Sequence, residues 1–412
     1  MTIGNSLWIG VSGLMAHGEA ISTVGDNIAN VSTVGFKRSR AMFNDLLGGE
    51  LNNSRLGGGV YLGGNQSIWQ QGTLQQTGNP LDVGISGTGM FVVNGNHAGR
   101  DGQFFTRDGR FTLDASGTLV TQNGMRVQGY GIANGVRGTS VGDLALGGRQ
   151  SPPVASTNAA MTLNLDSNSP AQTYDPADPN GTSSYSTSVT VYDSLGAPHQ
   201  ATVHFTKTPA NDWEWHATVD GAEVGGTAGT PVEIANGTMA FDANGNLTNQ
   251  AMLSSSASFT NAAANQAIAF DFTGTTQNSG VSVISASNVD GRSAGSLIDV
   301  KINPDGTIDG IYDNGDTIAI AQLALADFAN NEGLMREGDS LYTATRESGQ
   351  VLMDVAGSGG RGSLMSGALE QSNVDLSSEL VQLIAYQRAF QANSKIVTTA
   401  DEMMLEVTNL KR

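Results

Sequence analysis

Apolar residues repeat with heptad spacing at both ends of this chain, and this repeat limits the possible folds more than any other feature. Near the N-terminus the 4-3-4-3-4-3 spacing runs from Leu7 to Ile28. Near the C-terminus one seam runs from Leu376 to Val397, and a second, shifted around the helix, runs from Ile396 to Leu410. Apolar heptads predict helices that pair along their length. Two C-terminal seams indicate more than one neighbour.

The first predicted helix is a poor one in isolation. Its five glycines cost about 4 to 5 kcal/mol of helix stability relative to alanine. An ordinary intramolecular hairpin would be marginal, because ordering the backbone offsets most of the burial. Neighbouring copies would supply the missing burial, so we expect the terminal segments to be disordered in the free subunit and to fold on polymerisation, with the glycines allowing close helix approach. The expected interface residues are Leu7, Val11, Leu14, Ile21, Ile28, Leu376, Leu380, Leu383, Phe390, Val397, Met403, Val407 and Leu410.

An asparagine-rich turn comes after this helix, in the stretch NIANVSTVGFKRSR, residues 27–40. Asn27 and Asn30 end the heptad, and Gly35 can adopt a positive φ that most residues cannot. Lys37, Arg38 and Arg40 come just after a helix C-terminus, where cations are favoured. A C-cap with solvated charges accounts for this chemistry without a ligand.

Charge is unevenly distributed along the chain. The formal net charge is −18; residues 1–60 sum to zero and residues 370–412 to −2, so the residues between carry −16. This acidity argues against nucleic-acid binding, which needs clustered cations. The chain has no cysteine, the first cation is Lys37, and no apolar run reaches about 18 residues. We therefore expect neither a disulfide, a cleaved signal peptide nor membrane insertion.

The middle of the chain, from about residue 72 to 360, has the alternation and glycine turns of antiparallel β structure. Successive strands are predicted to be joined at Asp108-Gly109, Ser116-Gly117 and Asn123-Gly124. The segments 111–120, 239–248 and 300–309 each have the pattern strand, aspartate turn, glycine, strand. Alternating Trp213, Trp215, Ala217 and Val219 predict a further strand.

Two segments of boundary-like composition divide this middle part. Residues 151–184 are rich in Pro, Ser and Asn, and a second boundary falls near 285–295. The fold class we expect is α+β and mainly β, with coiled-coil-like paired terminal helices and two antiparallel β domains nested in an out-and-back path. The expected domains are 1–30 with 370–412 (inner helices), 31–71 with 357–369 (extended linker), 72–150 with 286–356 (first β domain) and 151–285 (outer β domain).

Motifs that suggest catalysis or metal binding are better explained as turns. GSGGRG, residues 357–362, has dinucleotide-loop spacing, but the segment after it, SLMSGALEQSN, has no immediate helical period. Asp305, Asp309, Asp313 and Asp316 lack EF-hand spacing, and the five histidines lack a paired metal-ligand spacing on a helix. We expect no enzyme activity, no cofactor and no metal.

Both ends and the order of the segments resemble the bacterial flagellar rod and hook family. NIANVSTVGFKRS is similar to that family's N-terminal signature, and the segment from Gly367 to Met404, GALEQSNVDLSSELVQLIAYQRAFQANSKIVTTADEMM, to its C-terminal one. The resemblance assigns the signature turn to Asn27, Asn30, Thr33, Gly35, Phe36 and Lys37. GNPLDVGISGTGMFVV resembles the family's first β domain, and the segments around VTVYDSLGAPHQATVHF are similar to hook members rather than the shorter distal rod proteins.

The resemblance implies a tubular homopolymer, the flagellar hook, that acts as a universal joint and transmits torque from rod to filament. It also implies partners: other copies of the chain, the rod, hook-cap and hook–filament junction proteins, and the export apparatus through which the unfolded chain leaves the cell. A distal rod protein is the alternative within the family; a nucleotide-binding enzyme and a secreted monomeric adhesin are alternatives of other classes.

Overall fold

The computed structural model describes residues 3–51, 54–209, 212–261 and 265–409. It divides into two compact units. Unit 1 contains residues 1–148, 299–311 and 317–412, and unit 2 contains residues 149–298 and 312–316. Unit 2 is thus inserted between two passages of the chain through unit 1. The four-domain division expected from the sequence is finer than this partition and stays a prediction.

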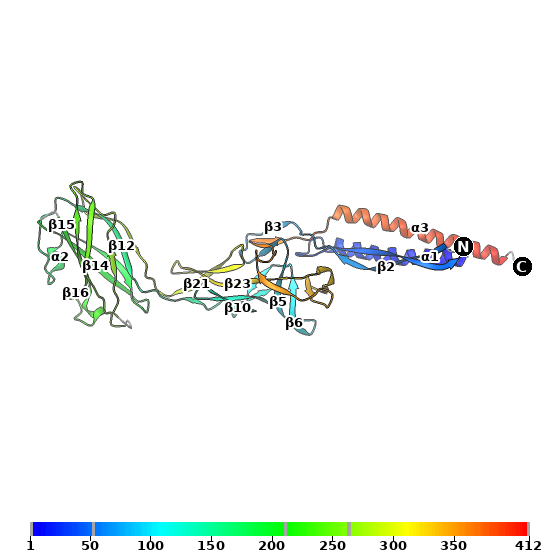
Figure 1. Ribbon diagram of the computed structural model, residues 1–412, viewed down its shortest axis with the longest axis horizontal. Coiled ribbons are helices and arrows are strands. Elements are labelled where there is room, and N and C mark those ends of the chain that lie inside the picture. The colour runs from blue at the N-terminus through cyan, green and yellow to red at the C-terminus, as the bar shows by residue number, and fades with distance from the viewer. Residues whose placement is uncertain (1–2, 52–53, 210–211, 262–264, 410–412) are drawn as a thin grey trace. The chain divides into compact units, whose positions relative to one another are not determined.

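A long helix lies near each terminus of the chain, and the two helices lie side by side (Figure 1). α1 (Ile3–Ala29) and α3 (Leu376–Asn409) contact each other, as the heptads predict. The expected fold class is confirmed: the chain is mainly β, with paired terminal helices.

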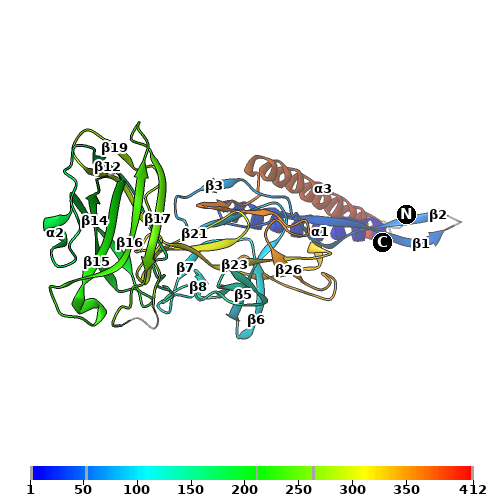
Figure 2. The same ribbon diagram turned by 60° about the vertical axis from the view of Figure 1, so that its left-hand side comes forward.

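A long antiparallel hairpin accompanies α1 (Figure 2). It consists of β1 (Ser39–Leu51) and β2 (Ser54–Ser67), paired from Ser39↔Ser67 to Leu51↔Ser54 with several register shifts. The sequence predicts only an extended linker for this part. It lacks a two-residue Asn-Gly or Asp-Gly turn and has glycines within the second strand, so the usual hairpin signals are absent.

The β part of unit 1 is built around a sheet in which β22, β23, β9, β5, β6, β25 and β24 lie next to one another in this order. Its buried residues include Val92, Phe105 and Ala324. The chain's two passages also pair as β3 with β28 and as β4 with β27. The strands are β3 (Leu74–Gln76), β4 (Val83–Ser86), β5 (Met90–His97), β6 (Arg100–Thr106), β7 (Phe111–Leu113), β8 (Leu119–Thr121), β9 (Arg126–Ala133), β10 (Val136–Asp143), β22 (Thr307–Tyr312), β23 (Thr317–Asp327), β24 (Met335–Gly338), β25 (Leu341–Thr343), β26 (Leu352–Val355), β27 (Ser363–Ser366) and β28 (Ala368–Glu370), with a 3₁₀ turn η2 (Asn331–Gly333).

Two of the three predicted hairpin turns are confirmed. Ser116-Gly117 joins β7 to β8, and Asn123-Gly124 joins β8 to β9. The prediction for Asp108-Gly109 is wrong, because β6 pairs with β5 and β25 instead of β7. The Asp108 carboxylate accepts hydrogen bonds from the backbone and side chain of Arg110, and the Gly109 carbonyl accepts one from Val83. The turn therefore lies against β4 rather than closing a hairpin.

Most strands in the described residues of unit 2 belong to two sheets. One is a five-stranded meander in the order β13-β14-β15-β16-β17; in the other, β12 pairs in parallel with β18 and β19 and antiparallel with β20. Trp215 of β15 contacts Phe270 and Phe272, with ring centroids 5.4 and 5.1 Å apart, in the core that the two sheets share. The elements are β11 (Gln150–Ser151), β12 (Asn158–Asp166), α2 (Pro179–Thr182), β13 (Tyr185–Tyr192), β14 (Pro198–Lys207), β15 (Asp212–Asp220), η1 (Gly221–Val224), β16 (Pro231–Phe241), β17 (Leu247–Ser255), β18 (Ala269–Asp271), β19 (Thr276–Asn278), β20 (Val283–Val289) and β21 (Gly295–Ile302), the last of which continues into unit 1.

The alternation predicted for residues 213–219 is confirmed, since all four apolar side chains are buried on β15. Strands occupy parts of both segments of boundary-like composition. The segment 151–184 contains β12, whose Ala159, Met161, Leu163 and Leu165 enter the core of unit 2, and β20 extends through residue 289 into the segment 285–295. The short alternation AAMTLNL was hidden by its Pro- and Ser-rich flanks.

Candidate polymerisation surface and the polar joint beside it

Small residues form the buried side of α1. Ala16, Ala20 and Val24 are almost fully buried, and two glycines lie close to α3. A Cβ placed on Gly10 would lie 2.9 Å from Val397 Cγ2, and one on Gly13 would lie 2.7 Å from the Asn393 side chain. The close-approach role expected of the glycines therefore holds at these two positions. It does not hold at Gly4 or Gly25, which have nothing within 4 Å, or at Gly18, whose nearest neighbour is an ordinary contact away.

An aromatic cluster joins α1, β1 and α3. The His17 ring lies 5.1 Å from Phe43 and 6.0 Å from Tyr386, and the latter two lie 5.9 Å apart. The hairpin is also tied to α1 by Ser12, whose hydroxyl accepts a hydrogen bond from Val60 N. Two helices and one hairpin thus form a common layer.

The predicted seam residues are only partly covered within one chain. The α1 positions Leu7, Val11, Leu14, Ile21 and Ile28 are all of intermediate burial. On α3, Leu383 and Val397 are intermediate, whereas Leu376, Leu380, Phe390, Met403 and Val407 are exposed; Leu410 lies outside the described residues. Their role as a polymerisation interface stays a prediction.

Further large apolar side chains, which the heptads do not include, are exposed on the same layer. Met15 is 72% exposed, Trp8 70% and Val381 68%. A face this apolar is unusual for a chain that remains monomeric. The helical layer therefore exposes large apolar side chains that its contacts within one chain do not cover.

The signature turn connects this layer to the β part of unit 1. Asn27 is buried; its amide donates to Ser39 O at 2.7 Å and to Glu379 Oε2 at 3.1 Å, and its Oδ1 accepts from Ser39 N at 2.9 Å. One side chain thus holds α1, the start of β1 and the first turn of α3.

The rest of the turn is fixed by local contacts. The Asn30 Oδ1 accepts a hydrogen bond from Thr33 Oγ1 at 3.0 Å. Gly35 has φ 69°, and a Cβ there would lie 2.8 Å from the backbone of Arg107, so glycine is required on both grounds. Phe36 is buried beneath the Arg336 guanidinium, 4.7 Å from its ring centroid.

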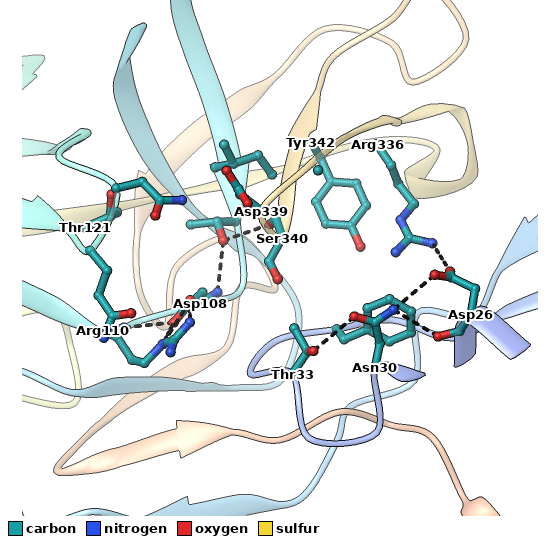
Figure 3. Close-up of a pocket in the computed structure, with 16 residues that line it drawn as sticks. Asp26, Asn30, Thr33, Asp108, Arg110, Thr121, Arg336, Asp339, Ser340 and Tyr342 are labelled. Atoms are coloured by element: carbon teal, nitrogen blue, oxygen red, sulfur yellow. Dashed lines mark hydrogen bonds and ion pairs between the residues drawn. The ribbon is translucent and has the colours of Figure 1, made fainter. Parts of the chain in front are cut away.

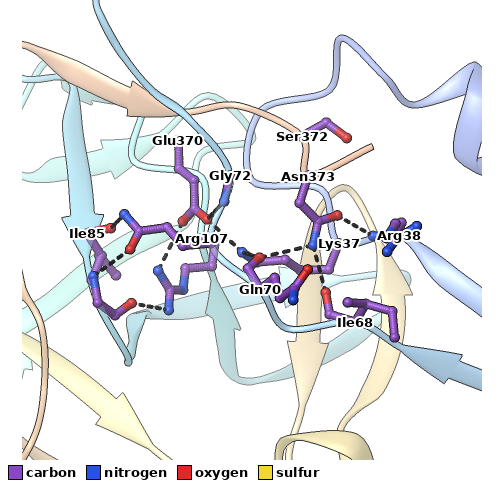
Figure 4. A network of polar contacts seen from close by, with 12 residues as sticks. Lys37, Arg38, Ile68, Gln70, Gly72, Ile85, Arg107, Glu370, Ser372 and Asn373 are labelled. Carbon is purple, nitrogen blue, oxygen red and sulfur yellow. Dashed lines mark hydrogen bonds and ion pairs between the residues drawn. The ribbon is translucent and has the colours of Figure 1, made fainter. Parts of the chain in front are cut away.

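Three charged side chains meet in a buried joint beside this turn (Figure 4). Glu370 Oε1 accepts hydrogen bonds from Lys37 Nζ at 2.6 Å and Gly72 N at 2.8 Å, and Oε2 accepts one from Arg107 Nη1 at 3.0 Å. Lys37 is only 1% exposed and also donates to Gln70 O. We call Lys37, Arg107 and Glu370 the buried triad.

The expectation of solvated charges after the helix is therefore wrong for Lys37. Burial lowers the pKa of Lys37, and the ion pair and hydrogen bond to Glu370 oppose that shift. Burial likewise lowers the pKa of Arg107, again opposed by Glu370. Sequence reasoning did not identify Arg107 or Glu370 as partners because they lie far from Lys37 in the chain.

A polar cleft of about 430 Å³ lies close to the signature turn (Figure 3). Its lining includes Asp26 and Asn30 from the helical side and Arg336, Ser340 and Tyr342 from the β side. The contacts across it are weak ones: Arg336 Nη1 lies 3.8 Å from Asp26 Oδ2, and Ser340 Oγ donates to Val34 O at 3.3 Å.

The glycine-rich segment 357–362 does not have the surroundings of a dinucleotide site. The next element along the chain is the strand β27, and Gly357 N bonds to Gly362 O within a turn. A phosphate loop would instead open a helix. None of the helices in the described ranges has the length and hydropathy of a membrane span.

Comparison with known families shows the class of protein to which this paired helical layer, hairpin and nested β units belong. Four flagellar family descriptions match successive parts of the chain. They are Flagella basal body rod protein over residues 7–37, Flagellar hook protein FlgE/F/G D1 domain over 84–158, Flagellar basal body protein FlaE D2 domain over 162–292, and Flagellar basal body rod FlgEFG protein C-terminal over 365–410.

Full-length relatives narrow this class. The flagellar hook protein FlgE of Escherichia coli K12 is 37% identical over 97% of this chain and 98% of its own length, and that of Salmonella typhimurium is equally similar over the same shares. The flagellar hook protein FlgE of Treponema pallidum is 34% identical over 99% of each chain. This chain therefore belongs to the flagellar hook protein family.

Proposed function

We propose that the chain is the structural subunit of the flagellar hook, a tubular homopolymer that serves as a flexible universal joint between rod and filament. The similarity to hook proteins over almost the whole length supports this function. The match of residues 162–292 to a D2 domain favours it over a distal rod protein, for which we expected no second β unit. The exposed apolar helical layer is the single structural observation that favours a polymer over a monomeric adhesin.

The same proposal includes the partners and the location. The subunit associates with other copies of itself and with the rod and basal body, as its family implies. We further propose contacts with the hook cap and hook–filament junction proteins, and export through the flagellar apparatus to an extracellular site. The role is structural and needs no catalytic residue.

Electron microscopy of the purified protein at high concentration tests the polymer directly. We expect tubes from the unaltered chain. Val381→Glu should prevent them, because it places a charge on the exposed face of α3. Val136→Glu is the matched control, since Val136 is similarly exposed, at 71%, but lies on β10. Absence of tubes from the unaltered chain, or normal tubes from Val381→Glu, would contradict the proposal.

We also propose that the helical layer folds only on assembly. Support comes from its half-covered seams and from the glycine cost of α1, roughly 4 to 5 kcal/mol. Amide hydrogen exchange should show little protection of residues 4–28 in the free subunit and strong protection in tubes. Strong protection in the free subunit would show that the helices are stable without neighbours.

A further inference from the structure

The helical layer and the β part of unit 1 are joined in two very different ways. At the buried triad, the contacts are short, charged and excluded from solvent. Across the polar cleft, they are longer and partly exposed. Breaking the buried contacts of the triad costs several kcal/mol, whereas exposed ion pairs contribute little to stability.

Arg336 makes most of the contacts that cross the cleft. From β24 its guanidinium reaches the Asp26 carboxylate of α1, lies 3.3 Å from Ser39 Oγ of β1, and stacks over Phe36. Side chains on both sides are accessible, with Asp26 54% and Arg336 36% exposed. Water can therefore replace the two polar contacts, whereas release of the stacking contact uncovers part of the buried Phe36 ring.

The turn just after Arg336 closes the hairpin of β24 and β25. Asp339 and Ser340 have φ of 50° and 58° and lie between the paired residues Gly338 and Leu341, as a favoured two-residue hairpin turn requires. The Ser340 side chain makes one contact across the cleft, from Oγ to Val34 O at 3.3 Å. The turn therefore adds one weak contact across the cleft.

We propose that Arg336 is the releasable latch of a hinge that has the buried triad as its pivot. With the latch closed, the cleft stays at its present width. With Arg336 released, and with it the exposed hydrogen bond from Gln66 Nε2 of β2 to Glu332 Oε1 of η2 at 2.7 Å, the helical layer can rotate relative to the β part of unit 1 while Lys37, Arg107 and Glu370 remain paired. This inference rests on the proposed function, because a bending tube requires subunits whose parts change their relative orientation.

The distance between two spin labels in one subunit reports whether the cleft is open or closed in assembled tubes. Because the chain has no cysteine, Glu19→Cys on α1 and Thr112→Cys on β7 provide two unique attachment points, both exposed. Doubly labelled subunits are diluted into unlabelled ones so that only distances within a subunit are recorded. The expected result is a closed population and a smaller open one, with Arg336→Ala raising the open-to-closed ratio roughly 3- to 30-fold, as the loss of an exposed ion pair and a cation–π contact implies.

Two further variants separate the latch from a general loss of stability. Arg100→Ala removes an ion pair to Glu337 within the β part, at a similarly accessible site, and should leave the ratio unchanged. Arg336→Lys keeps the charge but not the planar stacking, and should give an intermediate ratio. Tubes with the same distance distribution for Arg336→Ala as for the unaltered chain would overturn the latch alone; failure of the unaltered chain to form tubes would overturn both the latch and the proposed function.

Discussion

At the scale of single residues, Glu370 has the largest predicted effect on stability. It is shared by two buried cations, so Glu370→Gln leaves Lys37 and Arg107 facing each other without an anion. Breaking a buried ion pair in this way costs about 3 to 5 kcal/mol. We expect hydrogen exchange in peptides covering residues 68–76 and 364–371 to accelerate strongly. Arg126→Ala, which removes a half-exposed pair with Asp143, is the control and should cost at most about 1 kcal/mol.

His204 predicts a pH dependence of unit 2. Burial, with a smaller contribution from the charge of His216, lowers the pKa of His204 below its ordinary value of 6.5. As the pH falls below 6.5 the unfolded chain binds a proton before the folded one does, so unit 2 loses stability on acidification. Thermal unfolding followed by the fluorescence of Trp213 and Trp215 should show a lower midpoint at pH 5 than at pH 7.5.

The His204→Gln variant should flatten the part of this profile between pH 5 and 7. His97→Gln, in unit 1, serves as the control and should leave the unfolding of unit 2 unchanged. An equally steep profile in His204→Gln would show that another group is responsible.

Residue roles could be anticipated only where they depend on local chemistry. The sequence indicates that Gly35 can adopt a positive φ, and in the structure its φ is 69°. The neighbours of Lys37 in the chain suggest a helix cap in solvent, whereas the burial of Lys37 depends on Glu370, 333 positions away. Such pairings require the topology, which no local pattern contains.

At the scale of elements, the helix interface gives a prediction that distinguishes its glycines. Gly10→Ala should weaken assembly, because the added methyl group meets Val397, whose branched side chain has little rotamer freedom in a helix. Gly25→Ala meets nothing and should raise helicity without harming assembly. The critical concentration for tube formation measures both. Equal effects of the two variants would show that close packing at Gly10 does not matter for assembly.

Elements with a clear hydrophobic period or a local turn signal are predictable from the sequence. Elements whose buried face depends on packing against a distant element are not. The terminal helices and the hairpins at Asp114, Asp242 and Asp305 could be predicted from heptads and aspartate turns; in each turn the carboxylate accepts backbone N–H groups, as at Ser116, Asn244 and Thr307. The β1–β2 hairpin was missed because its strands acquire a buried side only against α1.

At the scale of the whole molecule, the insertion of unit 2 predicts that it can be removed. The chain enters and leaves it side by side, with Val154 and Arg292 bonded backbone to backbone in both directions. Replacing residues 156–290 by a short Asn-Gly linker should leave the rest of the chain folded and able to assemble, with altered bending. Circular dichroism and microscopy of this deletion provide the measurement. Wholesale misfolding would show that unit 1 depends on the insertion.

The buried triad also makes closure of this joint depend on a chain that extends at least to Glu370. Its members come from residue 37, residue 107 and residue 370, so the two cations leave the export channel long before their shared anion if the N-terminus emerges first. A subunit truncated before Glu370 would hold two unneutralised charges at the site where its halves should close. We therefore expect chains truncated before Glu370 to close this joint poorly and to enter tubes less readily than complete chains.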